Sequence, residues 1–134
     1  MKLSKKSEYA CLALIDLSEQ YHADLVKIEE LSIRKKIPRK YLEQILLQLK
    51  SSGYVKSVRG SSGGYKLAKD PSCINVAEIV RLMDGALAPV ESASLHFYEH
   101  TPIEQSEKLV IVFRDIRDYI SDKLEKTNFA DLLP

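Results

Sequence analysis

Pro38 sets the strongest constraint on how this chain can fold. It separates a short segment, 28–35, from a longer one whose apolar residues recur at helical spacing. Proline is disfavoured inside a helix but suits its first turn, so the chain is predicted to break at Ile37 and to start a new helix at Pro38. The inward face of this helix is predicted to be Leu42, Ile45, Leu46 and Leu49, and Gly53 is predicted to end it.

The segments on either side of this helix pair extend the pattern. Residues 5–20 carry small and apolar residues at helical spacing and predict an earlier helix. Residues 54–58 alternate like a strand, 59–64 form a glycine-rich turn, and 65–68 return as a second strand. Three helices followed by a β-hairpin are the layout of a winged helix-turn-helix, so the fold class is predicted to be mostly α with a small β-hairpin wing.

The second half of the chain predicts two more helices and a long connection. Asn75 and Glu78 have the spacing of a capping box, and that helix is predicted to run to Asp84 and stop at Gly85. Residues 86–105 are predicted to be irregular, and 106–126 to form a long helix. The chain is therefore divided into a DNA-binding domain (1–85), a connecting or sensor loop (86–105), and a dimerisation helix with its tail (106–134).

The long helix carries one apolar stripe along its length. The stripe consists of Leu109, Phe113, Ile116, Ile120 and Leu124. A helix of this length can project from a small domain, and a second copy of the chain is then the simplest partner for the stripe. The alternative, that the helix folds back on its own domain, stays open because an apolar stripe does not identify its partner.

Composition and charge narrow the functional class. The longest apolar runs among the 134 residues are too short to span a membrane, and the amino-terminal segment does not resemble a secretory leader. With only two cysteines, Cys11 and Cys73, the sequence predicts a cytoplasmic protein rather than a disulfide-stabilised one. The sequence offers no nucleophile–base pair, so an enzyme is not expected.

Positive charge is concentrated on the predicted winged helix. Residues 34–69 hold ten Lys or Arg and one acid, a net of +9 in a chain whose overall net charge is +1. Such asymmetry favours a polyanion as ligand, and double-stranded DNA is the polyanion that this fold binds. A protein-interaction adaptor that retains a winged helix is the alternative, although an adaptor would not need this charge.

Particular side chains suit particular contacts with DNA. Arg39 and Lys40 open the third helix, where positive charge and free N–H groups favour phosphate, and Gln44 could bind adenine in the major groove. Tyr41 could contact DNA or pack in the core, and Arg59 at the hairpin tip suits a minor groove. The residues predicted to contact DNA are Lys36, Pro38, Arg39, Lys40, Tyr41, Gln44, Arg59, Gly60, Ser61, Ser62 and Gly64.

Five stretches in register resemble one family of regulators. They are Lys2-Leu3-Ser4 with Tyr9-Ala10, the run 38–44, the run 55–60 with Gly63-Gly64-Tyr65, Ala88-Pro89-Val90, and 129–132. Through them the chain is similar to the IscR/NsrR/CymR-type regulators (the Rrf-two family). The resemblance implies homodimers joined through the long helices, a near-palindromic operator, contacts to DNA from Tyr41, Gln44 and Arg59, and repression or dual control in response to iron, redox, sulfur or another small effector or partner protein.

The chain departs from this family in its connecting loop. Many relatives hold an iron–sulfur cluster there with three cysteines, whereas residues 90–102 contain no cysteine, so no cluster is expected. His96, Glu99 and His100 spell a zinc-peptidase pattern, but nothing else in the sequence would complete a hydrolytic site. A metal or haem sensor using His96 or His100, with Glu8 and Cys11 as extra donors, and a pair of solvated histidines both remain open.

Overall fold

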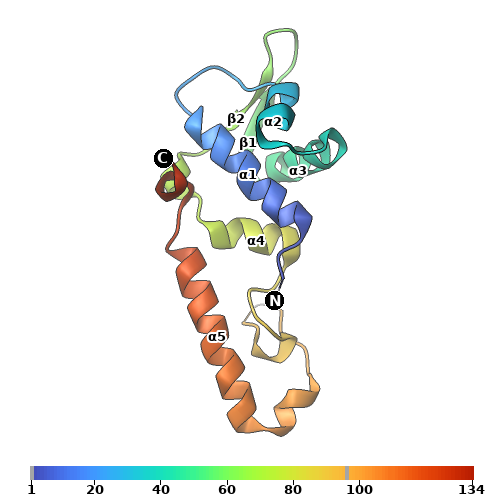
Figure 1. Ribbon diagram of the computed structural model, residues 1–134, viewed down its shortest axis with the longest axis vertical. Coiled ribbons are helices and arrows are strands. Elements are labelled where there is room, and N and C mark those ends of the chain that lie inside the picture. The colour runs from blue at the N-terminus through green and yellow to red at the C-terminus, as the bar shows by residue number, and fades with distance from the viewer. Residues whose placement is uncertain (1, 96) are drawn as a thin grey trace.

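The computed structural model describes residues 2–95 and 97–134 and confirms the predicted order of helices and strands. The elements are α1 (Lys5–Glu19), α2 (Ile28–Lys35), α3 (Arg39–Ser51), β1 (Val55–Val58), β2 (Gly64–Leu67), α4 (Val76–Asp84) and α5 (Glu107–Glu125). Helix α1 packs against α2, α3 and α4. The wing formed by β1 and β2 lies at one end of the elongated molecule, and the far end of α5 lies at the other (Figure 1).

The turn between α2 and α3 follows from two residues. Lys36 adopts the left-handed conformation, with φ of 53°, and Ile37 is fully buried beneath the turn. Ser32 holds the turn from both sides, because its carbonyl accepts from the Ile37 N–H at 3.0 Å and its hydroxyl donates to the Ile37 carbonyl at 2.6 Å. Pro38 is the N-cap, so α3 begins at Arg39, one residue later than predicted.

The hydrophobic core lies between α1 and α3. All four residues predicted to face inward on α3 are completely buried, together with Leu14 of α1 and Leu31 of α2. At the edge of this core the buried carboxylate of Asp16 accepts two hydrogen bonds from Arg34, at 2.8 and 2.9 Å. This bidentate pair joins α1 to α2 and satisfies a charge that would otherwise be costly to bury.

A third segment, at Val26, pairs with the wing, and the sequence did not indicate this pairing. Strands β1 and β2 pair antiparallel with Val55 opposite Leu67, and Val26, just before α2, forms a further bridge with Tyr65. The Val26 and Tyr65 N–H groups donate to each other's carbonyls at 2.9 and 2.8 Å. The base of the wing is therefore attached to the segment that leads into α2.

The connection predicted at 86–105 includes two short helical turns that the sequence did not indicate. These turns are the 3-10 helices Glu91–Ala93 and Pro102–Gln105, and the connection buries Ser92 and Ala93. The other described residues of this connection are irregular, as predicted, and the two turns are too short to show a period in the sequence. Arg117 of α5 donates to the Ala93 carbonyl at 3.0 Å, which holds the segment against α5.

The carboxyl terminus returns to the core of the winged helix. Asn75 and Glu78 form the predicted capping box at the start of α4, and that same start pairs with the chain after α5. The Val76 N–H donates to Thr127 at 2.9 Å, and Phe129 is completely buried in the main core. No helix in the described part of the chain is both long and apolar enough to cross a membrane.

Candidate nucleic-acid interface

One face of α3 projects away from the core and carries polar and cationic side chains. Lys40, Gln44 and Leu47 are all exposed on it, opposite the buried face. The first turn of α3, which the structure describes in full, contains neither an acidic residue nor a side-chain cap. Its N–H groups and the positive end of the helix dipole therefore remain available to a phosphate.

Arg39, in this first turn, lies between two carboxylates. Its Nη2 is 3.1 Å from Glu29 of α2, and its Nε is 3.3 Å from Glu43 one helical turn along α3. All three side chains are about half exposed, so the two ion pairs are weak and can be exchanged for a phosphate. The charges of Glu29 and Glu43 nevertheless reduce the net positive potential at this end of the recognition helix.

The sequence left open whether Tyr41 packs in the core or contacts DNA, and the structure places it at the surface with its ring partly supported. Its side chain is 44% exposed, so it does not belong to the core. Its ring packs edge-on against Tyr9 of α1, with the ring centroids 5.4 Å apart. The exposed part of Tyr41 can therefore contact DNA while its ring is supported by Tyr9.

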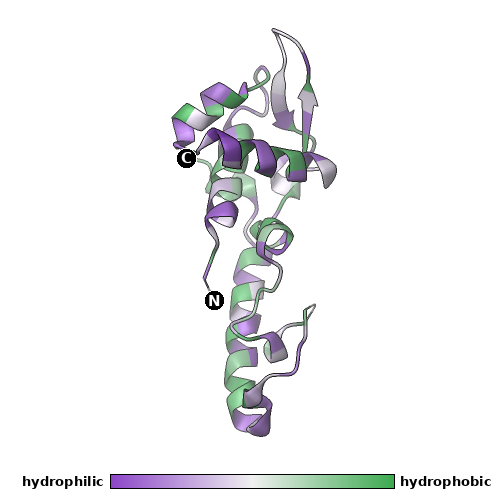
Figure 2. Cartoon of the chain, turned by 90° about the vertical axis from the view of Figure 1, so that its right-hand side faces the viewer, coloured by the Kyte–Doolittle hydropathy of each residue, from purple (hydrophilic) through white to green (hydrophobic). Residues whose placement is uncertain are grey.

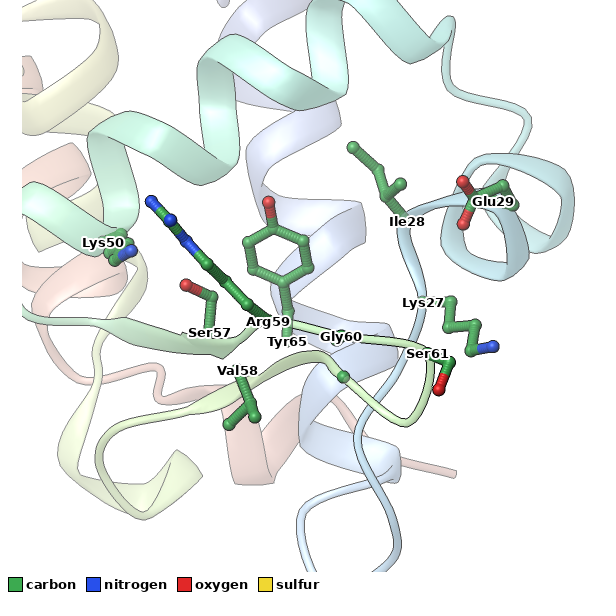
Figure 3. A pocket seen from close by; sticks show the side chains of 12 residues that line it. Lys27, Ile28, Glu29, Lys50, Ser57, Val58, Arg59, Gly60, Ser61 and Tyr65 are labelled. Carbon is green, nitrogen blue, oxygen red and sulfur yellow. The ribbon is translucent and has the colours of Figure 1, made fainter.

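A cleft of about 500 Å³ opens between the wing and the helices. Its walls carry Lys27 before α2, Lys50 of α3 and Arg59 of the wing (Figure 3). In Figure 3 the side chains of Arg59 and Tyr65 point from the wing toward α3. Three cations on three separate segments therefore line one concave surface together with Glu29, and their net positive charge suits the phosphate backbone of a nucleic acid.

Two glycines of the wing are required by close packing within the protein. A Cβ added at Gly63 would lie 2.0 Å from the Val58 carbonyl oxygen, and one added at Gly64 would lie 2.6 Å from that of Val26. Gly60 has open space around it but a φ of +106°, which favours glycine. The glycines thus shape the wing, and the predicted role of Gly60 and Gly64 in approaching DNA stays a prediction.

The predicted DNA-contacting residues share one region of the molecule. Ten of the eleven are exposed, in the turn before α3, on α3 and at the wing tip, and Gly64 is half-buried. Sequence reasoning missed Lys27 and Lys50 as members of this surface. Lys50 lay within the basic segment 34–69, but Lys27 precedes it, and only the Val26–Tyr65 pairing places Lys27 beside the wing.

The candidate metal ligands are not assembled into a site. His96 lies outside the described residues, His100 pairs with Glu104, and the exposed Glu8 pairs with Lys5 at 3.5 Å. Across residues 2–95 and 97–134, no group of three His, Cys, Asp or Glu side chains is placed to hold a metal ion. Burial, followed by the charge of Asp84, raises the pKa of the Cys11 thiol to about 11, which disfavours the thiolate that a metal or cluster binds.

The predicted stripe of α5 divides into two sets. Phe113, Ile120 and Leu124 are half-buried, and the last two pack on α4, whereas Leu109 and Ile116 are exposed. Val112 and Tyr119 are exposed as well, at 52% and 73%, and sequence reasoning missed both of them. Their spacing of three and four residues from Leu109 and Ile116 was the signal that could have found them. Figure 2 shows hydrophobic segments along α5, well away from the wing.

Comparisons with known proteins agree with this geometry. Residues 3–134 match the model of the Rrf2 family, described as iron-dependent transcriptional regulators. The regulator CymR of Bacillus subtilis is 30% identical over 132 residues, which are 98% of this chain and 89% of CymR.

Two solved structures share the architecture. The structure of CymR, the global cysteine regulator of B. subtilis, matches with a TM-score of 0.79 at 29% identity, covering 98% of this chain and 95% of that one. A structure of IscR from T. potens matches with a TM-score of 0.76 at 28% identity, covering 98% and 85%. The chain therefore belongs to the Rrf2 family and is a DNA-binding winged-helix transcriptional regulator rather than an enzyme.

Proposed function

We propose that this protein acts as a homodimer on a near-palindromic operator, each copy inserting α3 into a major groove and the wing into the adjacent minor groove. The observation that carries the proposal is that Lys27, Lys50 and Arg59 line one cleft beside the exposed face of α3. Phosphate contacts from these cations would position the protein on DNA, and Gln44 would contact a base edge. Because the ligand is operator DNA, we expect the protein to act in the cytoplasm.

The unpartnered face of α5 supports a second copy as the partner. Leu109, Val112, Ile116 and Tyr119 follow the alternating spacing of three and four residues that is typical of helix pairs. These four exposed residues form a face of α5 that continues into an apolar groove of about 270 Å³. The groove lies between α5, α4 and the amino terminus, and its lining residues include Leu3, Val80, Tyr119 and Leu124. A symmetric pair of α5 helices would cover both stripes at once.

We also propose that the regulator works without an iron–sulfur cluster. Residues 86–105 contain no cysteine, and the two cysteines of the chain lie on separate elements, α1 and the turn before α4. A cluster normally requires several thiolates in one place, which this donor set does not supply. Without a cluster, the signal would be a small effector or a partner protein.

DNA binding can be tested with an operator selected from a random pool of duplexes. Affinity measured by fluorescence anisotropy should fall steeply with salt, and the selected duplex should bind much more tightly than a scrambled one. Arg59→Ala is expected to weaken binding at least about tenfold and Gln44→Ala to relax base preference at one position, whereas Lys108→Ala on distant α5 is the matched control. Unchanged affinity in both variants, or equal affinity for scrambled DNA as an adaptor would show, would contradict the proposal.

The dimer is tested separately by sedimentation velocity. Ile116→Asp should yield monomers and weaken operator binding, because it places a charge within the apolar stripe. Ile111→Asp is the matched control, since Ile111 is also exposed on α5 but lies outside the stripe. A monomeric wild-type protein, or an Ile116→Asp variant that remains dimeric, would refute this mode of association.

A further inference from the structure

The last turn of α4 is bonded to two elements of the winged helix. Gln48 of α3 donates through Nε2 to the Leu82 carbonyl at 3.1 Å. The Ser4 N–H donates to Asp84 Oδ2 at 3.0 Å, and the Ser4 hydroxyl donates to the other carboxylate oxygen. Ser4 is also the N-cap of α1, where its Oγ accepts from the Ser7 N–H at 3.1 Å. The end of α4 therefore holds both the recognition helix and the start of α1.

The same turn is where residues 86–105 begin. Gly85 ends α4 with a φ of +86°, and a Cβ added there would lie 3.8 Å from the ring of Phe97. Phe97 thus lies close to the turn from which the segment emerges, and the segment is also attached to α5 through Arg117 and Ala93. A rearrangement of the segment around Phe97 would act directly on Gly85 and on the carboxylate beside it.

Both ends of the recognition helix connect back to this turn. At the carboxyl half of α3 the connection is the single hydrogen bond from Gln48 to Leu82. At the amino half, Tyr41 packs on Tyr9 of α1, whose first turn Ser4 fixes to Asp84. A shift of the α4 terminus would therefore change the tilt of α3 rather than simply translate it, because the two connections meet α3 on different turns.

We propose that Gln48 and Asp84 are positioning residues for DNA binding, which couple the orientation of the recognition helix to the state of residues 86–105. This inference rests on the proposed function and extends it by assigning the route through which a signal at that segment reaches DNA. Gln48 lies on α3 and is half-buried. Because its amide is bonded to Leu82, it acts through α4 rather than by touching a base.

The hydrogen bonds of Ser4 also keep Asp84 ionised. Partial burial raises the pKa of this carboxyl, but the two hydrogen bonds from Ser4, with further contributions from Ser7 and the charge of Lys6, outweigh burial and hold the pKa below the ordinary range. The link between α4 and α1 is therefore a charge-assisted one at neutral pH, which is stronger than a bond between neutral groups.

Hydrogen–deuterium exchange tests the coupling without knowledge of the effector. Coupling between two sites is reciprocal, so if residues 86–105 influence operator binding, the operator must alter residues 86–105. With the full chain and a selected operator, we expect slower exchange in α3 and the wing, from direct contact, and also in residues 86–105, which lead from α4 toward the end of the molecule opposite the wing (Figure 1).

Gln48→Ala is the decisive variant. It should keep the slower exchange in α3 and lose it in residues 86–105, with operator affinity reduced about three- to tenfold. Ser51→Ala is the matched control, because it removes a side-chain hydrogen bond of 2.9 Å to Leu47 within α3 and should leave both responses intact. Asp84→Asn, which keeps the shape of the side chain but removes its charge, is the second variant and should also diminish the remote response.

The outcomes separate the two proposals. Slower exchange in α3 of the wild type without any change in residues 86–105 would overturn the coupling and leave the proposed function standing. A full remote response in both Gln48→Ala and Asp84→Asn would likewise overturn it. If the selected duplex protects neither α3 nor the wing, the proposed function fails and the coupling fails with it.

Discussion

Arg39 and Glu29 form an ion pair, 3.1 Å between Nη2 and Oε1, that joins the first turn of the recognition helix to α2. Glu29 also lines the cleft beside the wing, where its negative charge opposes the phosphate backbone. Glu29→Gln should therefore tighten DNA binding about two- to fivefold, the range expected for one exposed charge. Anisotropy titrations measure the change, with Glu107→Gln at the exposed start of α5 as the control. Weaker binding by Glu29→Gln would show that Glu29 orients Arg39 for DNA instead of competing for it.

Replacing Lys36 is predicted to change the stability of the protein and its affinity for DNA in opposite directions. Among the described residues it is the one non-glycine residue with a positive φ, a conformation that costs a side chain about 1–2 kcal/mol. Lys36→Gly should raise the free energy of unfolding by up to about 1 kcal/mol, partly offset by the entropy of glycine in the unfolded chain.

The same substitution removes a cation from the turn before α3. It should therefore weaken operator binding and lower the salt dependence by up to about one unit of slope. Urea denaturation and anisotropy measure the two effects. Lys35→Gly is the matched control, because Lys35 is the last helical residue of α2 and glycine there should destabilise the protein, by up to about 1 kcal/mol. A Lys36→Gly variant that is less stable than the wild type would contradict this account of the turn.

Phe129 is predicted to be essential for the stability of the winged helix, although it lies near the end of the chain. Its side chain is completely buried in the main core, so Phe129→Ala should lower the free energy of unfolding by about 3–5 kcal/mol. Leu132→Ala, three residues later and 40% exposed, should cost less than about 1 kcal/mol. Chemical denaturation compares the two, and equal losses would mean that the tail does not pack as described.

The two thiols should differ in reactivity. Burial, reinforced by the charge of Asp84, raises the pKa of Cys11 to about 11, whereas Cys73 is exposed. Because the thiolate is the reactive form, iodoacetamide at pH 8 should modify Cys73 at least about tenfold faster than Cys11. The difference should narrow as the pH rises toward 11, since Cys11 then ionises.

Mass spectrometry of the single variants Cys11→Ser and Cys73→Ser assigns each rate to one thiol. Faster modification of Cys11 would contradict its burial and would restore it as a candidate thiol sensor. The expected result instead assigns Cys11 a packing role at the junction of α1 and α4.

Patterns that arise within one or two helical turns were readable from the sequence. Pro38 located the helix-turn-helix within one residue, and the capping box at Asn75 located the start of α4. Both depend on local backbone geometry, which neighbouring residues determine. The hairpin and the basic face of α3 were predicted for the same reason, since strand alternation and helical spacing are short-range properties.

Features that depend on a few distant residues were not readable. The bridge between Val26 and Tyr65 is a single pair, and the buried Phe129 lies in a 3-10 helix of four residues, so neither has a period. The sequence showed which residues of α5 are apolar, but not which of them pack on α4 and which stay exposed for a partner. That division depends on where α4 packs, which only the tertiary structure decides.

The sequence by itself therefore determined the winged helix, its basic face and the family, because each follows from local spacing or from motifs in register. The tertiary structure alone decided which side chains are available for DNA. In it, Gln48 donates a hydrogen bond to the Leu82 carbonyl, and Arg39 forms ion pairs with Glu29 and Glu43. Lys27 lies beside the wing, where it lines the cleft. These relationships join residues from separate elements, and their geometry exists only once packing has fixed the elements against one another.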